Sequence, residues 1–304
     1  MASNGHSTAH PPIAPLTGPK AVFYDRLLTR TFVKDCLCEE CARDHYLNYP
    51  YSCCLGHFPN EIPIVPGKRP TTVVHSRLRH YEALQLVRSS IQYFSRPPIE
   101  MDIEQLEAVT EIQRLLYHGG LIATLGSYDM RFALSVDEMR TLITLLLAVF
   151  FFGAAIPFEF AWHSNHLETY DWIGVTVTEN RNGQDVECIA IHPTKVIPSV
   201  GDSPNYNRAL AVQRLSTLMH ELIHAVIKTL CCRECRAADD NLAHHGRTWQ
   251  RLALGIETEF AKFFGLSLDL GRMDGVLNDM VSPGAEFRYP SRHDLEIYEF
   301  VEPR

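Results

Sequence analysis

The sequence of 304 residues lacks a run of lysine or arginine, an internal repeat, and an apolar stretch as long as the roughly 20 residues of a membrane-spanning helix. Its net charge of −8 at pH 7 argues against attraction of nucleic-acid phosphates by the chain as a whole. Residues 1–20 are polar and contain prolines, without the apolar core of a signal peptide. These absences predict an intracellular protein, nuclear or cytoplasmic, without a membrane partner.

The most apolar segment, residues 141–156 (TLITLLLAVFFFGAAI), carries no charge but is shorter than a membrane span. It belongs to a predicted helix over residues 135–152, which begins with Ser135 in the capping-box pattern SVDE. Because Gly153 lies near the end of the segment and a strand is predicted directly after it, we expect this helix to be buried in the core.

A pair of histidines one helical turn apart is the most informative pattern in the sequence. His220, Glu221 and His224 belong to the string HELIH, inside a segment with helical apolar periodicity. Residues i and i+4 share one face of a helix, so both imidazoles can bind the same tetrahedral Zn²⁺. Glu221 can then act as general base and general acid at the open position of the metal.

The helix that carries HELIH is predicted to span residues 207–230. Ser203 followed by Pro204 predicts its N-cap and a proline in its first turn. The plainer interpretation is a core helix with two hydrogen-bonded histidines. Burying two imidazoles beside a carboxylate is costly without a further partner, which favours a metal site.

A third metal ligand would decide the class of metallopeptidase. A metzincin continues its motif with glycine and histidine at the positions that Ile227 and Leu230 occupy here, and the sequence has no GTxD string. Further along, the string HHGRTW offers two adjacent candidates, His244 and His245.

The string HELIH, a loop, and a second helix opening with HGRTW resemble the SprT-like metallopeptidases, the zinc-dependent family that includes Spartan, over residues 136–270. The resemblance implies that His220, His224 and His245 bind the catalytic Zn²⁺. It also implies that Glu221 is the catalytic base.

The same resemblance implies an α+β, zincin-like fold in the order helix, small three-stranded sheet, HExxH helix and second ligand-bearing helix. From the sequence, we expect strands at residues 158–162, 172–178 and 187–192, and the string NRNG at 180–183 predicts the turn between the last two. Trp249 is expected to anchor the second helix in the core.

Composition and pattern divide the chain into five regions. We expect a disordered tail at 1–20, a Cys-rich segment and linker at 21–72, a helical extension at 73–130 with two helices between Val74 and Tyr117, the SprT-like metallopeptidase domain at 131–270, and a C-terminal tail at 271–304. The sequence assigns no role to this last region.

The cysteines concentrate in two clusters, one near the N-terminus and one between HELIH and the second histidine pair. A CxxC pair from each cluster could together form a second, structural zinc site: Cys38, Cys41, Cys232 and Cys235. Two alternatives stay open, namely a zinc site contained within the N-terminal cluster, and cysteines that are reduced or disulfide-linked.

The predicted function is a zinc endopeptidase that acts on protein substrates, with Arg247 as a candidate for the oxyanion partner. Because Spartan-type relatives cut proteins crosslinked to DNA, the resemblance implies DNA association, for which residues 204–251 are the locally basic segment. One alternative is a non-catalytic, zinc-stabilised interaction module, whose closed site needs a fourth ligand such as His244 or Cys235. Another is a secreted zinc protease with disulfides, against which the missing signal peptide argues.

Overall fold

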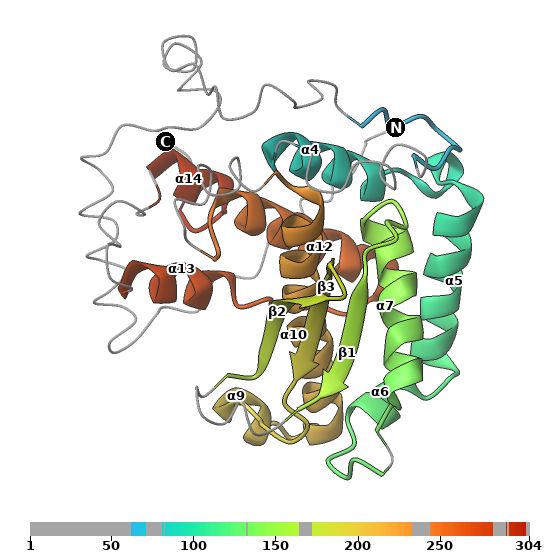
Figure 1. Cartoon of the computed structure of the whole chain (residues 1–304). Coiled ribbons are helices and arrows are strands. Elements are labelled where there is room, and N and C mark those ends of the chain that lie inside the picture. Colours follow the sequence, from blue (N-terminus) through green and yellow to red (C-terminus); the bar gives the residue numbers. More distant parts are fainter. Residues whose placement is uncertain are drawn as a thin grey trace, which may run out of the picture.

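A computed structural model of the chain describes residues 62–70, 81, 83–131, 133–163, 172–232, 244–281, 290 and 292–301. In these residues, helices lie behind one small three-stranded sheet and along its β1 side (Figure 1). The α+β class expected from the sequence is confirmed.

The described elements follow one another as a helical part, a sheet and a second helical part. Before the sheet lie α4 (Ala83–Phe94), the 3₁₀ helix η2 (Pro98–Glu100), α5 (Ile103–Tyr117), α6 (Leu121–Leu125) and α7 (Val136–Phe150). The strands are β1 (Phe158–Trp162), β2 (Gly174–Arg181) and β3 (Gln184–Ile191). After the sheet lie α9 (Pro198–Gly201), α10 (Tyr206–Leu230), α12 (Arg247–Phe264), α13 (Arg272–Val281) and α14 (Arg292–Ile297). Helices α4 and α5 confirm the two helices expected before the metallopeptidase region.

Helix α7 begins where the sequence predicts. The Glu138 backbone N–H donates to Ser135 Oγ at 3.2 Å, and the Glu138 carboxylate accepts from the Ser135 backbone N–H at 2.7 Å. Residues of α7 such as Met139, Ile143 and Leu146 are fully buried, so the apolar segment is a core helix. No helix in the described parts of the chain is long and apolar enough to cross a membrane.

The sheet has the strand order β1-β3-β2. Strand β1 runs parallel to β3, whereas β2 is antiparallel to β3 and joined to it by a tight hairpin. The hairpin turn has positive φ angles at Asn182 (55°) and Gly183 (85°), which a two-residue turn of type I′ requires. The turn and the first strand therefore lie where the sequence predicts, and the other two strands are offset by a few residues.

Helix α10 differs from the sequence prediction at its N-terminus. It starts at Tyr206, and its N-cap residue is Asn205, which makes no side-chain capping bond. The prediction of Ser203 as the N-cap is therefore wrong. The Ser203 hydroxyl instead accepts the Asn205 backbone N–H at 3.3 Å in the turn before the helix.

One large hydrophobic cluster joins the helices before the sheet to those after it. Helix α10 runs behind the sheet in Figure 1 and packs against β2, β3 and α12. Trp249 of α12 is completely buried, as expected for an anchor of this helix. The boundary expected between regions 73–130 and 131–270 stays a prediction, since buried residues of both belong to this cluster.

A second, smaller cluster holds the last two helices together. It consists of the buried residues Val276, Leu295, Tyr298 and Phe300 from α13, α14 and the turn after α14. The region expected to be a C-terminal tail thus contains two packed helices.

Candidate metal centre

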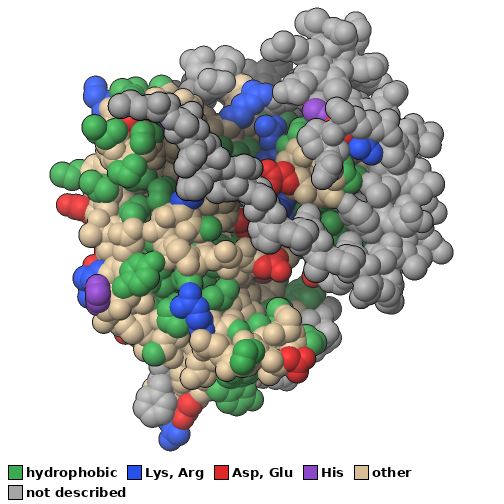
Figure 2. Space-filling view, turned by 180° about the vertical axis from the view of Figure 1, so that it is seen from behind, with side chains coloured by type: hydrophobic (Ala, Val, Ile, Leu, Met, Phe, Trp, Pro, Cys, Tyr) green, Lys and Arg blue, Asp and Glu red, His purple; other side chains and the backbone are tan. Residues whose placement is uncertain are grey.

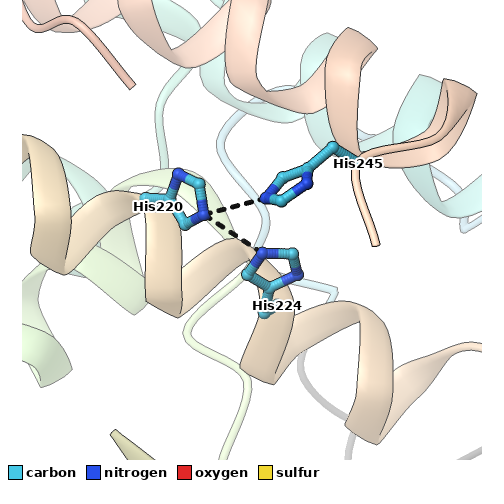
Figure 3. Close-up of side chains that lie close together, drawn as sticks. All are labelled: His220, His224 and His245. Atoms are coloured by element: carbon cyan, nitrogen blue, oxygen red, sulfur yellow. Dashed lines mark hydrogen bonds between the residues drawn. The ribbon is translucent and has the colours of Figure 1, made fainter. Parts of the chain in front are cut away.

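Helix α10 carries the first two histidines of the site. His220 and His224 lie one turn apart, and their Nε2 atoms are 3.2 Å apart (Figure 3). The local spacing of HELIH is sufficient for this approach, because both side chains leave the same face of the helix.

The third histidine comes from the residues that precede α12. His245 Nε2 lies 3.1 Å from His220 Nε2, so the three rings converge on one point (Figure 3). Among the described residues, His220, His224 and His245 form a group whose ligand atoms all lie within 4.8 Å of one another and could hold a metal ion. The competing candidate, His244, is exposed and does not belong to this group.

The spacing of the nitrogens fits a tetrahedral metal ion. Zn–N bonds of about 2.0–2.1 Å in tetrahedral geometry hold the ligand nitrogens about 3.3 Å apart. The Nε2 separations of 3.1 and 3.2 Å lie close to this value.

The hydrogen bonds of the rings also favour a cation between them. His220 Nδ1 lies 2.8 Å from the Leu270 carbonyl oxygen, which only accepts, so Nδ1 carries the proton. His245 Nδ1 faces the Asp279 carboxylate in the same way. In neutral rings the two Nε2 atoms then face each other with lone pairs, an arrangement that a bound cation stabilises.

Burial keeps two of the rings in the form that binds a metal. Burial lowers the pKa of His220, although the Glu221 carboxylate acts in the opposite direction. Burial, together with the His220 and His245 rings, holds the pKa of His224 well below its ordinary value. Neutral imidazole is the species that coordinates a metal ion.

Glu221 is the one carboxylate of the HELIH string, and it is only 5% exposed. The Thr176 hydroxyl of β2 lies 2.8 Å from Glu221 Oε2 and 2.9 Å from the Glu221 backbone carbonyl oxygen, so two acceptors share one hydroxyl proton. Burial raises the pKa of Glu221, while the His220 ring and the Thr176 hydroxyl oppose the rise. A Cβ atom on Gly174 would lie 2.5 Å from Thr217 Cγ2 and 3.0 Å from Glu221 Oε1, so the glycine lets β2 pack closely against α10 at this point.

Trp249 closes the site on the side of α12. Its ring centroid lies 4.7 Å from that of His220, 5.7 Å from that of His224 and 4.8 Å from that of His245. This contact gives the three imidazoles a rigid apolar support.

A chain of contacts fixes the Leu270 carbonyl that His220 uses. The Leu270 backbone N–H donates to Glu257 Oε1 at 2.8 Å, and Arg272 Nε donates to Glu257 Oε2 at 2.7 Å. The ligand on α10 is therefore oriented from α12 and from the residues that lead into α13.

Arg247, the candidate for the oxyanion partner, is paired with a carboxylate. Its Nε and Nη2 atoms donate to the two carboxylate oxygens of Asp294 at 2.7 and 3.0 Å. Asp294 is 4% exposed, so the pair is largely shielded from solvent. A guanidinium held in this bidentate pair argues against Arg247 as the oxyanion partner.

The predicted Cys₄ site is not tested by the structure. Cys38, Cys41 and Cys235 lie outside the described residues. Cys232 lies within them, just after α10, where its backbone N–H donates to the Tyr81 carbonyl at 2.9 Å.

Three of the described cations of the locally basic segment make contacts within the fold, whereas Arg208 of α10 is exposed. Arg214 is buried and donates to backbone carbonyls of residues 125 and 127. Lys228 donates to a backbone carbonyl of β2, and Arg247 is paired with a carboxylate. These contacts give no support to a phosphate-binding surface on this segment. On the face that Figure 2 shows, Lys and Arg side chains lie at several separate places, with Asp and Glu side chains among them.

Two residues that contact the site, Thr176 and Asp279, lie far from HELIH in the sequence and are not predicted by it. Thr176 is one of several threonines in a strand, and Asp279 is one aspartate in a polar helix 34 positions beyond His245. No spacing rule connects either residue to HELIH.

Compared with protein-family models, curated proteins and solved structures, the chain has no match. The SprT-like resemblance therefore stays a prediction from the motifs.

Proposed function

We propose that this protein is a zinc-dependent endopeptidase of the zincin-like, SprT-like type. The observation that carries the proposal is the convergence of His220, His224 and His245 through their Nε2 atoms, with Glu221 beside them on the same helix. Three imidazoles and an adjacent carboxylate are the donor set of a catalytic zinc site.

A Zn²⁺ ion at the three nitrogens would polarise a peptide carbonyl and lower the pKa of water. Glu221 would accept the proton of the attacking water and return it to the leaving nitrogen. Because the Thr176 hydroxyl contacts Oε2, the proton is expected to move through Oε1. Thr176 would hold the carboxylate in one orientation during both transfers.

The set of three ligands supports catalysis over the structural alternative. Structural zinc sites are closed by four protein ligands, whereas catalytic sites keep an open position. Within the described residues the group contains three histidines, and the exposed His244 is not part of it. The interaction module would need a donor from elsewhere, and it has no use for Glu221.

We propose protein chains as the substrate class. The resemblance to Spartan extends this to proteins attached to DNA, but the net charge of −8 and the internal contacts of Arg214 and Lys228 do not add support. Cleavage without any requirement for DNA is the expected behaviour.

The test combines elemental analysis of zinc with cleavage of a denatured protein, with and without DNA. Wild type is expected to carry zinc and to lose cleavage with a chelator, whereas the double variant His220→Ala/His224→Ala loses the zinc of this site and the activity. Zinc bound equally by this variant would mean that the motif is not the metal site.

Glu221→Gln separates metal binding from chemistry. We expect it to retain zinc but to slow cleavage by about 10²–10⁴-fold, because an amide cannot accept the proton of water. The control is Glu179→Gln, which makes the same change at an exposed position of β2. Unchanged cleavage by Glu221→Gln would contradict its role as general base.

A further inference from the structure

Asp279 on α13 holds the residue that supplies the third imidazole. Its Oδ2 accepts the His245 backbone N–H at 2.7 Å, and its Oδ1 lies 3.4 Å from Nδ1 of the same residue. The carboxylate thus contacts both the backbone and the ring of His245. Its side chain is only 13% exposed, which limits competition from water.

The contact between Asp279 and the His245 ring also determines which ring nitrogen carries the proton. A carboxylate beside Nδ1 keeps the proton on that nitrogen, so the lone pair lies on Nε2, where the other two imidazoles converge.

The backbone of α13 lies against the same ring. A Cβ atom built on Gly275 would lie 2.8 Å from His245 Cγ, which is closer than real Cβ atoms approach other atoms, and 3.0 Å from Cδ2. Glycine at this position lets the helix lie against the imidazole. Asp279 follows Gly275 by one turn, so both residues act from one face of α13.

Helix α14 contacts the chain two residues after His245, where Asp294 holds Arg247. The cluster of Val276, Leu295, Tyr298 and Phe300 packs α14 and α13 together. The turn that carries the third ligand is thus contacted by two helices that share a small cluster. Its orientation depends on contacts that lie outside the α10 helix.

We propose that Asp279 is a positioning residue for His245, and that α13 and α14 thereby form a part of the metal centre that sets its affinity for metal. This inference rests on the proposed metal binding. The His220 and His224 pair alone offers two ligands, and the third becomes effective only where Asp279 and Gly275 hold its ring.

The test measures Zn²⁺ affinity of the full-length, metal-free protein in competition with a chromophoric chelator. Asp279→Asn is expected to bind Zn²⁺ about 10–100-fold more weakly than wild type, as for other residues that orient a metal ligand. Asp274→Asn is the matched control, since it removes one charge from an exposed position of the same helix. Co²⁺ absorption reports the ligand geometry, and thermal unfolding of the metal-free variants reports the fold.

Weaker Zn²⁺ binding and a changed Co²⁺ spectrum in Asp279→Asn, with an unfolding midpoint of the metal-free protein close to that of wild type, would support the inference. Wild-type affinity in Asp279→Asn, or an equal loss in Asp274→Asn, would overturn it. A lower unfolding midpoint with unchanged affinity would also overturn it, because the role would then be structural only. Absence of Zn²⁺ binding by the wild type is a different result, because it would refute the proposed function itself.

Discussion

Helix α10 and the pair α13–α14 both orient histidines of the candidate metal centre, but they are embedded very differently. Most residues of α10 are buried, and the helix packs against the sheet and α12 within the large cluster. Helices α13 and α14 are joined by a cluster of four buried residues: Val276, Leu295, Tyr298 and Phe300. The first two candidate ligands are therefore fixed by the global fold, whereas the third depends on a part with little core of its own. Local opening is expected to begin in such a part.

The strongest way to test this difference is to remove core volume from each region. Leu218 of α10 and Leu295 of α14 are both fully buried. Leu218→Ala is expected to lower the free energy of unfolding by about 2–5 kcal/mol, because it leaves a cavity in the large cluster. Leu295→Ala should have a smaller effect on global unfolding, measured by urea denaturation of the metal-free protein. An equal loss of unfolding free energy in the two variants would show that the two regions unfold as one unit.

The contact between α13 and the ring can be broken without changing charge. In Gly275→Ala the new Cβ would overlap His245, so the ring must move. We expect Zn²⁺ affinity to fall by about 10–100-fold, as for a misoriented ligand. Gly201→Ala is the control, because nothing lies within 4 Å of its added Cβ and its φ is not positive. A Gly275→Ala variant with wild-type affinity would mean that α13 can move aside freely.

On α10, the contact to be tested joins Glu221 to the Thr176 hydroxyl. Glu221 is not one of the three proposed metal ligands. Thr176→Val removes the hydroxyl that donates to Glu221 Oε2 while it keeps the shape of the side chain. A hydrogen bond to a charged group contributes about 1.5–3 kcal/mol, so we expect about 10–100-fold slower cleavage with zinc content unchanged. Thr176→Ser retains the hydroxyl and should restore most of the rate. Equal rates for the Val and Ser variants would remove Thr176 from the proposed function.

The smallest expected effect is at Glu257, which acts on His220 through the Leu270 backbone. Glu257→Gln keeps an acceptor for the Leu270 N–H but weakens the pair with Arg272. We expect Zn²⁺ affinity to fall by no more than about 10-fold, the lower end of the range for residues that support a metal ligand. A larger loss than in Asp279→Asn would reverse the comparison, because the α10 ligand would then be the less firmly held one.

Much of the architecture follows from local patterns in the sequence. The SVDE capping box starts α7, and the NRNG turn joins β2 to β3. The apolar segment over residues 141–156 lies in the core. The N-cap of α10 was predicted wrongly, because Ser203 can bond the backbone of a preceding turn as readily as that of a helix. Caps depend on a single hydrogen bond, whereas helices and strands are specified by many residues.

Local spacing is enough to place His220 and His224 on one face of α10, because residues i and i+4 lie one helical turn apart. The packing of the folded chain is what brings His245, and not His244, to this pair and holds Arg247 against Asp294. It alone brings Thr176 and Asp279 to the site. Contacts between residues far apart in the chain depend on how helices and strands pack, and no spacing in the sequence encodes that packing.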